Sequence, residues 1–260
     1  MLFLLACLPA TALAQTLTLA STTSTEASGL FDTILPAFES ESGIDVRVVA
    51  VGTGAALRYG QRCDADLVIV HAPEAETTFV EAGYGVERHP LMHNDFVLIG
   101  PESDPAGIAG TTDAAEAMAI IAEAGSPFVS RGDDSGTHKK ELALWEAAGI
   151  DLRRAGDWYR ATGAGMGQAL NTARAMEAYI LADRGTWISF GKRGNLRVLA
   201  EGDARLRNPY SVILVNPERC PSVPEAPARR FIDWLLSQAG QRAIGGYRLR
   251  GQQLFVPDAD

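Results

Sequence analysis

The most informative stretch of this 260-residue chain reads Ser130-Arg131-Gly132-Asp133-Asp134-Ser135-Gly136-Thr137. An amphipathic helix is expected directly after it, with Leu142 and Trp145 three residues apart and Gly149 as its end. The first N–H groups of such a helix lack intrahelical partners and lie at the positive end of its dipole. Arg131 adds a fixed charge and a forked set of donors. The stretch therefore predicts a cradle for a tetrahedral oxyanion, while a simple helix cap after a polar turn is the alternative.

A second segment rich in hydroxyl groups lies near the N-terminus. Residues 16–20 alternate polar and apolar side chains like a strand, and Ser21-Thr22-Thr23-Ser24-Thr25 follows them. Apolar residues then recur at the four-residue steps of a helix over residues 30–38. Five consecutive hydroxyl residues exceed the single side-chain oxygen that a helix cap uses. The pattern predicts further anion donors, with Thr22 and Thr23 as candidates, and an over-provided cap is the alternative.

A third, smaller cradle is expected after the strand-like residues 46–51. Gly52-Thr53-Gly54 places the hydroxyl of Thr53 between two glycines, where the backbone can approach a ligand closely. On its own, this tripeptide is a weak signal, and it gains weight only from the other two segments.

Together these segments resemble the tungstate-binding proteins of ABC transporters, within the type II periplasmic binding-protein architecture. The resemblance covers nearly the whole chain and rests on several blocks that occur in one order. The blocks are Ser21-Thr22-Thr23-Ser24, Val49-Ala50-Val51-Gly52-Thr53-Gly54, Asp64-Ala65-Asp66, residues 71–76, Asn94-Asp95-Phe96-Val97, residues 130–140, residues 162–167, residues 183–186 and Asn208-Pro209-Tyr210.

Strand-like and helix-like segments alternate along the chain, as in an α/β protein. The resemblance implies a two-lobed type II periplasmic binding protein with a discontinuous first lobe, residues 15–95 and 211–260. An inserted second lobe would comprise residues 96–210. Two crossovers, near Asp95 and near Tyr210, would form the hinge between the lobes.

The resemblance also implies which residues bind the anion. The first lobe would offer Thr22, Thr23 and Thr53, and the second lobe would offer Ser130, Arg131, Ser135, Gly136 and Thr137. Asp133 and Asp134 should face away from the ligand, capping the helix or orienting Arg131, because a buried carboxylate beside a dianion is costly. Thr162 is a candidate for an extra donor, and no cofactor or metal is expected.

His71 bears on which anion fits. The related phosphate-binding proteins resemble this chain in the arginine loop, but they carry an Asp after the strand that corresponds to residues 64–70. That Asp accepts the proton of phosphate, whereas tungstate, molybdate and sulfate are fully ionised at neutral pH and need only donors. Since His71 stands in place of the Asp, we expect tungstate, with molybdate, sulfate or phosphate as alternatives. His71 itself is expected near the rim of the pocket.

Composition restricts the partners of the chain. Its net charge of −9 excludes a strongly basic surface for nucleic acid. Anion capture must therefore come from local donors rather than from the overall field. The resemblance implies a monomer that delivers its ligand to an ABC permease with a cytoplasmic ATPase.

Residues 1–14 read as a secretory signal peptide, which predicts a periplasmic protein. An apolar stretch runs from Leu2 to Leu8, and Ala12-Leu13-Ala14 precedes Gln15 as a cleavage site. The usual positively charged start of a signal peptide is missing, and a lipoprotein attached through Cys7 is the alternative.

Removal of the signal peptide leaves Cys63 and Cys220, an even pair in an oxidising compartment. Cys63 precedes the strand expected at residues 67–70, and Cys220 follows the strand expected at residues 211–215. The lobe assignment places both in the first lobe, and we expect them to form a disulfide.

Enzymatic alternatives find little support in the sequence. A serine hydrolase would use Ser135 with His138 as its base, but the Gly-x-Ser-x-Gly pattern is absent. His89 and His93 are four residues apart, and Pro90 between them disfavours the shared helical face that a metal site would need. We therefore expect a binding protein rather than an enzyme.

Overall fold

The structure is a computed structural model that describes residues 15–133 and 135–259. The expected signal peptide at residues 1–14 lies outside the described residues, as do Asp134 and Asp260. Within the described ranges, no helix has both the length and the apolar character that a membrane crossing needs.

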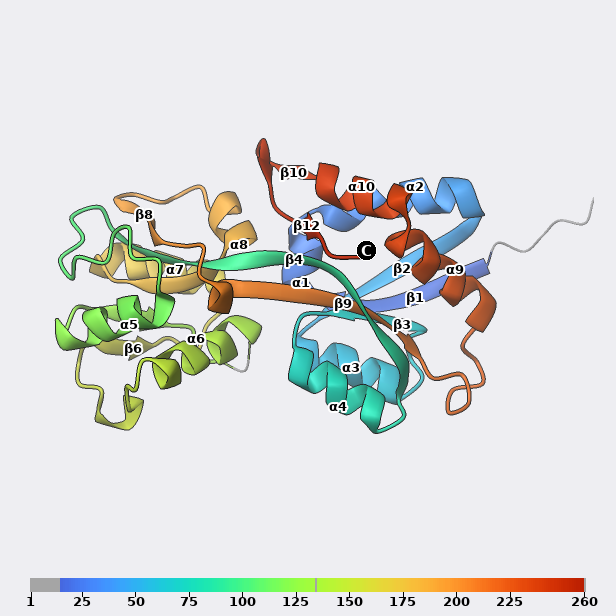
Figure 1. Cartoon of the computed structure of the whole chain (residues 1–260), viewed down its shortest axis with the longest axis horizontal. Helices are drawn as coiled ribbons and strands as arrows, with labels where there is room; N and C mark the ends of the chain where they lie inside the picture. The colour runs from blue at the N-terminus through green and yellow to red at the C-terminus, as the bar shows by residue number, and fades with distance from the viewer. Residues whose placement is uncertain (1–14, 134, 260) are drawn as a thin grey trace, which may run out of the picture.

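Two lobes are joined by two long neighbouring strands (Figure 1). Strand β4 covers Gly85–Pro101, strand β9 covers Arg207–Val215, and the two pair antiparallel. The crossovers expected near Asp95 and Tyr210 fall within these strands. The two-lobed α/β architecture is thus confirmed, while the lobe boundaries at 95/96 and 210/211 stay predictions.

The first lobe is built on a sheet with the strand order β12-β4-β9-β3-β1-β2. Strands β1 (Gln15–Thr22), β2 (Ile44–Val51) and β3 (Leu67–Val70) run parallel, and β3 pairs antiparallel with β9. The helices of this lobe are α1 (Thr23–Ala27), α2 (Leu30–Ser42), α3 (Thr53–Gln61), α4 (Pro73–Glu81), α9 (Glu225–Leu236) and α10 (Gln238–Gly246). Figure 1 shows α2, α9 and α10 on one face of this sheet and α3 and α4 on the other.

The second lobe gathers around the far end of β4. Strands β7 (Ile180–Asp183) and β8 (Leu196–Ala200) pair antiparallel with β4, and β5 (Phe128–Ser130) pairs parallel with β6 (Tyr159–Ala161). Its helices are α5 (Ala114–Glu123), α6 (Gly136–Ala147), α7 (Met166–Met176) and α8 (Arg184–Ser189), with short 3-10 turns at Leu152–Arg154 and Ala204–Leu206. The chain ends with β10 (Arg248–Leu249), β11 (Gln252–Gln253) and β12 (Val256–Pro257), of which β12 pairs with β4.

Each lobe has apolar clusters that hold its helices on its strands. Phe38 of α2 packs against Phe231 and Trp234 of α9, with ring centroids 4.7 and 5.7 Å apart. In the second lobe, Phe128 of β5 packs edge-on against Trp145 of α6 at 4.9 Å. These aromatic contacts hold α2 against α9 and α6 against β5.

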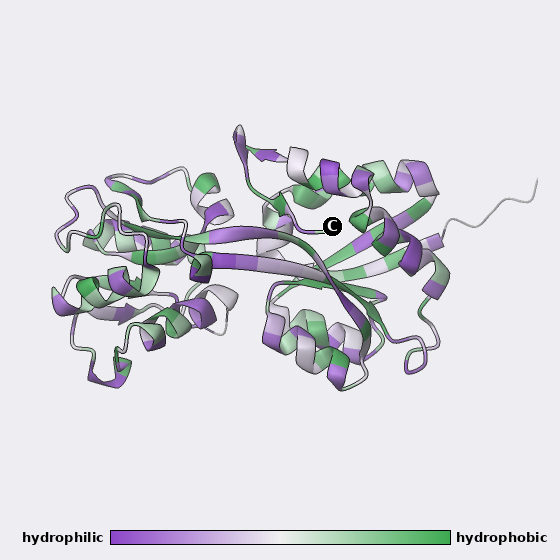
Figure 2. Cartoon of the chain, in the orientation of Figure 1, coloured by the Kyte–Doolittle hydropathy of each residue, from purple (hydrophilic) through white to green (hydrophobic). Residues whose placement is uncertain are grey.

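The stretches of β4 and β9 between the lobes are hydrophilic in character (Figure 2). Asn94 and Asn208 pair across the two strands, and the side-chain amide of Asn208 donates to Oδ1 of Asn94 at 2.7 Å. Both side chains are buried, and this bond satisfies a donor and an acceptor that burial would otherwise leave unpaired.

Strand β4 begins at Gly85, well before the apolar run at residues 96–99 that reads as a strand in the sequence. Residues 85–95 contain charged side chains and Pro90, which disfavour a strand when the sequence is read alone. Pairing with β9 outweighs this local preference, and the register shifts between Pro90 and Met92, where proline cannot donate to the ladder.

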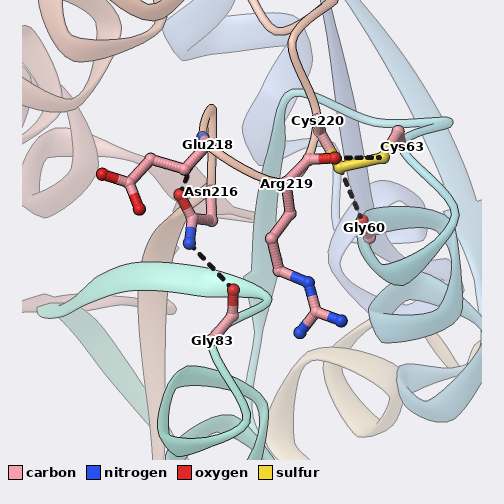
Figure 3. Close-up of a disulfide and its surroundings, with 7 residues drawn as sticks. All are labelled: Gly60, Cys63, Gly83, Asn216, Glu218, Arg219 and Cys220. Carbon is pink, nitrogen blue, oxygen red and sulfur yellow. Dashed lines mark hydrogen bonds between the residues drawn. A yellow bond between two sulfur atoms is a disulfide. The ribbon is translucent and has the colours of Figure 1, made fainter.

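Cys63 and Cys220 form the expected disulfide, which is thereby confirmed (Figure 3). It joins the turn after α3 to the segment after β9, over a Cα–Cα distance of 5.3 Å. Nearby, the side-chain amide of Asn216 donates to the carbonyl of Gly83 at 2.9 Å. All these residues belong to elements of the first lobe, so the bridge links one lobe internally and does not cross the hinge.

Candidate functional site

A cavity of about 550 Å³ lies between the lobes, and both lobes contribute to its walls. Three groups of residues line it: elements of the first lobe, elements of the second lobe, and strand β9 of the hinge. They are Thr22, Thr23, Ser24, Ala27, Val51, Gly52, Thr53 and His71; Phe96, Arg131, Asp133, Ser135, Gly136, Thr137, Gly165, Met166, Gly167, Asp183 and Thr186; and Asn208 and Tyr210.

Most of the residues expected to bind the anion line this one cavity. They are Thr22, Thr23, Thr53, Arg131, Ser135, Gly136 and Thr137. Ser130 differs, because its side chain is fully buried and does not line the cavity. Its hydroxyl accepts from the backbone N–H of Gly132 at 3.1 Å and lies 3.1 Å from Nδ1 of His138. Ser130 therefore lies behind the arginine loop.

Three helices of nine residues or more begin at the cavity. Their N-caps are Gly52 for α3, Ser135 for α6 and Gly165 for α7, and all three residues line the cavity. Each helix start presents unpaired N–H groups and the positive end of a dipole. The cavity thus favours an anion despite the negative charge of the whole chain.

The hydroxyl-rich residues 21–25 include some that support the structure and some that line the cavity. Ser21 is buried and donates to the carbonyl of Ile69 on β3 at 2.8 Å. Thr22 caps the short helix α1 by accepting from the N–H of Thr25, at 3.3 Å. Thr22, Thr23 and Ser24 line the cavity, so the run is more than an over-provided cap.

Arg131 is held by the carboxylate of Asp133. One guanidinium nitrogen of Arg131 donates to Oδ2 of Asp133 at 2.5 Å, and the hydroxyl of Ser135 donates to Oδ1 at 2.6 Å. Burial raises the pKa of Asp133, but these bonds outweigh it and hold the pKa below its ordinary value. Asp133 orients Arg131 as expected, but the expectation that it faces away from the ligand is wrong, because it lines the cavity. Asp134 lies outside the described residues.

One buried donor of the Arg131 guanidinium has no partner. Nε of Arg131 is buried and has no hydrogen-bond partner among the described residues. A buried charged donor without a partner is costly, so this guanidinium group favours a nearby acceptor such as an anion.

His71 lies on the cavity wall and is fixed by the hinge. Its ring stacks on Tyr210 with centroids 4.7 Å apart, and Nδ1 donates to Oδ1 of Asn208 at 2.9 Å, because the amide of Asn208 donates to Asn94. Burial lowers the pKa of His71 below its ordinary value, so the ring is neutral at pH 7. His71 thus adds no positive charge to the cavity at that pH.

Two further polar side chains near the cavity are engaged with the protein. The hydroxyl of Thr162 donates to the carbonyls of Ser130 and Arg131 at 3.1 and 3.2 Å, so it supports the arginine loop. Asp183 accepts from the N–H and the hydroxyl of Thr186 at 2.8 and 2.5 Å, and caps α8. Both side chains therefore make hydrogen bonds within the protein.

Comparison with known proteins identifies the family. The family model of the PBP superfamily domain matches residues 9–239. The tungstate-binding protein TupA of Peptoclostridium acidaminophilum is 46% identical over 245 residues, which cover 93% of this chain and 85% of that protein. The chain belongs to the tungstate-binding protein family of the PBP superfamily.

Solved structures of the tungstate-binding protein family share its fold. The tungstate-binding protein TupA from Desulfovibrio alaskensis G20 is 46% identical, with a TM-score of 0.90 over 95% of this chain and 100% of that one. The structure described as the tungstate ABC transporter from Geobacter sulfurreducens is 45% identical, with a TM-score of 0.80 over 89% of this chain and 98% of that one. The type II periplasmic binding protein architecture is therefore confirmed.

The serine hydrolase alternative is wrong. Ser135 accepts from the backbone N–H of His138 at 3.2 Å and donates to Asp133, so its hydroxyl does not face the imidazole. The ring of His138 instead approaches the buried Ser130. Relatives in the tungstate-binding protein family are transport proteins rather than enzymes.

Among the described residues, no group of three or more His, Cys, Asp or Glu side chains could hold a metal ion.

Several cavity residues were not among the expected ligands. The start of α7 at Gly165, Met166 and Gly167 lines the wall, as do Asp183 and Tyr210. All of them fall in sequence blocks that carry the resemblance to the tungstate-binding protein family. The sequence feature that could have predicted the role of α7 is the glycine-rich segment directly before it. Glycines there permit close approach of a ligand to the helix start.

Proposed function

We propose that this protein captures tungstate in the cavity between its lobes and delivers it to the permease of an ABC transporter. The main support is that Arg131, serine and threonine hydroxyls and three helix starts, contributed by both lobes, line one cavity. Relatives at 40 to 46% identity are named tungstate-binding proteins. No bond is made or broken in this function, and no cofactor is needed.

The proposed contacts come from both lobes at once. The first lobe offers the hydroxyls of Thr22, Thr23 and Thr53, and the second lobe offers Arg131 and the start of α6 from Ser135 to Thr137. The side chain of Ser130 leaves this set because it is fully buried.

Closure of the lobes completes the site in this proposal. A five-atom oxyanion fills only part of a cavity of about 550 Å³, so the lobes must approach each other for all donors to reach it. The strands β4 and β9 connect the lobes and would flex as the hinge, as in other periplasmic binding proteins. Exclusion of water then strengthens each hydrogen bond to the anion.

The proposed setting is the periplasm, with residues 1–14 as the signal peptide. The protein would act as a monomer whose first lobe comprises residues 15–95 and 211–260 and whose second lobe comprises residues 96–210. Its macromolecular partner would be the permease, and we propose no nucleic-acid partner.

Molybdate, sulfate and phosphate are the alternative ligands within the same architecture. Tungstate and molybdate share charge and nearly share size, so the donor set accommodates both. Phosphate differs because it is partly protonated at neutral pH and needs an acceptor. The carboxylates of Asp133 and Asp183 at the wall already accept hydrogen bonds from Arg131, Ser135 and Thr186.

Isothermal titration with tungstate, molybdate, sulfate and phosphate tests the proposed function. We expect tight binding of tungstate at pH 7.5 and poor competition by phosphate at equal concentration. Repeating the tungstate titration at a higher sodium chloride concentration controls for nonspecific electrostatic attraction. Displacement of tungstate by equimolar phosphate would mean that an acceptor is available, with Nε2 of His71 the first to examine. An absence of tungstate binding would refute the proposal.

Gly132→Ala should weaken tungstate binding and lower stability. Gly132 has φ +62°, and a Cβ there would lie 2.7 Å from Cβ of Ala161. The left-handed backbone alone costs about 1–2 kcal/mol for a residue other than glycine, and the contact would displace the arginine loop. Titration and thermal melting measure both effects. Gly156→Ala, whose Cβ meets nothing within 4 Å, is the control in the same lobe. Equal affinity of Gly132→Ala and wild type would show that the loop geometry is not needed.

A further inference from the structure

A carboxylate is buried directly behind the arginine loop. The side chain of Glu141, on α6, is 1% exposed, and it packs in the core of the second lobe. Its Oε1 accepts from the hydroxyl of Tyr159 at 2.8 Å and from Nε1 of Trp145 at 3.3 Å. A buried carboxylate seldom raises stability relative to an apolar side chain of the same volume. Its presence therefore calls for a role other than packing.

Glu141 is connected to the loop through His138 and Ser130. Oε2 of Glu141 lies 3.7 Å from Nδ1 of His138, and the same nitrogen lies 3.1 Å from the hydroxyl of Ser130. That hydroxyl accepts from the N–H of Gly132 at 3.1 Å. Nδ1 of His138 therefore faces both the carboxylate of Glu141 and the hydroxyl that holds Gly132.

This chain of bonds ends at the backbone next to Arg131. The carbonyls of Ser130 and Arg131 accept from the backbone N–H groups of Thr162 and Ala164 at 3.0 and 3.1 Å. The N–H of Gly132 points the other way, to Ser130. The loop is thereby held on two sides, and the backbone conformation that carries Arg131 depends on both.

We propose that Glu141 acts through His138 and Ser130 as a positioning residue that holds the Gly132 N–H and so aims Arg131 into the cavity. The inference rests on the proposed function, since it explains how the anion-binding arginine is oriented. Ser130, His138 and Glu141 share their residue types with a hydrolase triad. Ser130 is fully buried and lies outside the cavity wall, so the group has no access to a substrate.

The variants Ser130→Ala and Glu141→Gln test this positioning. In the wild-type background, each should weaken tungstate binding about tenfold, because Ser130→Ala removes the acceptor of the Gly132 N–H and Glu141→Gln removes the carboxylate that faces His138. In an Arg131→Ala background, neither should weaken binding more than about twofold, because the arginine that they position is absent. Glu146→Gln, an exposed residue on the same helix, should match the wild type in both backgrounds.

The pattern of the double variants decides the proposal. Equal losses with and without Arg131 would overturn it, because Ser130 and Glu141 would then act on binding independently of Arg131 or through general destabilisation. Wild-type affinity in both single variants would also overturn it. Ser130→Ala is the smaller change, so it carries the test if Glu141→Gln does not fold.

A second measurement does not depend on tungstate. Amide hydrogen exchange of Gly132, followed by NMR on the ligand-free protein, should be at least tenfold faster in Ser130→Ala and Glu141→Gln than in wild type and Glu146→Gln. Unchanged exchange would overturn the positioning role even if the protein binds tungstate. Faster exchange in a protein that binds no tungstate would leave the positioning of the loop supported and the proposed function refuted.

Discussion

Arg131→Ala is expected to weaken tungstate binding by more than about a hundredfold. Hydrogen bonds to charged groups contribute about 1.5–3 kcal/mol each, and about 2.8 kcal/mol corresponds to a hundredfold change in affinity. Arg131 also carries the only full positive charge among the proposed contacts, and its buried Nε has no other partner among the described residues. Removing it leaves the carboxylate of Asp133 beside the dianion without its counter-charge.

Isothermal titration of three variants checks this prediction. Thr53→Ala removes one neutral hydroxyl from the same cavity and should cost about tenfold or less. Arg131→Lys should recover only part of the loss, because an ammonium cannot donate to the anion and to Asp133 with the same fork. Thermal melting of each variant controls for folding. Equal affinities of Arg131→Ala and wild type would remove Arg131 from the site.

The sequence predicted best what short-range patterns encode. The helix expected over residues 30–38 is present as α2, and the helix after the arginine stretch begins at Gly136, directly after the Ser135 cap. Local apolar periodicity and cap residues determine such elements. The first half of β4 was missed, because residues 85–95 become a strand only by pairing with β9, more than a hundred residues further along the chain.

The same distinction holds for the site. Hydroxyls and glycines at helix starts were predictable, since the start of a helix fixes where its own N–H groups point. His71, Asn208 and Tyr210 meet only because β3, β4 and β9 lie side by side, and no local pattern reveals that contact.

Ser130 shows a different limit of sequence reasoning. It precedes Arg131 directly, and its hydroxyl suits an anion site. Ser130 is the last residue of β5, and successive side chains of a strand point to opposite faces. Its side chain therefore turns into the lobe toward His138, while Arg131 reaches the cavity. The sequence identified the correct loop. Which side chains of that loop line the cavity became clear only from the position of Ser130 at the end of strand β5.

Loss of the Cys63–Cys220 disulfide is expected to lower the melting temperature by on the order of 10 °C. The bridge spans a sequence separation of 157 residues. Closing so long a loop stabilises by about 4–5 kcal/mol in the chain-entropy model, an upper figure because native strain offsets part of it. For a protein of this size, each kcal/mol shifts the melting temperature by about 2–4 °C.

Tungstate affinity should stay within about twofold of the wild type when the bridge is absent, because both cysteines lie in the first lobe and neither lines the cavity. Cys63→Ser combined with Cys220→Ser gives the cleanest comparison, and reduction of the wild type by dithiothreitol gives a second one. Dithiothreitol added to the double variant controls for effects of the reductant itself. Two free thiols at Cys63 and Cys220 in mass spectrometry of the unreduced protein would contradict the bridge. A large loss of affinity together with the loss of stability would show that the bridge restrains the hinge. A bond within one lobe can otherwise affect the binding of an anion between the two lobes only if it changes how the lobes move.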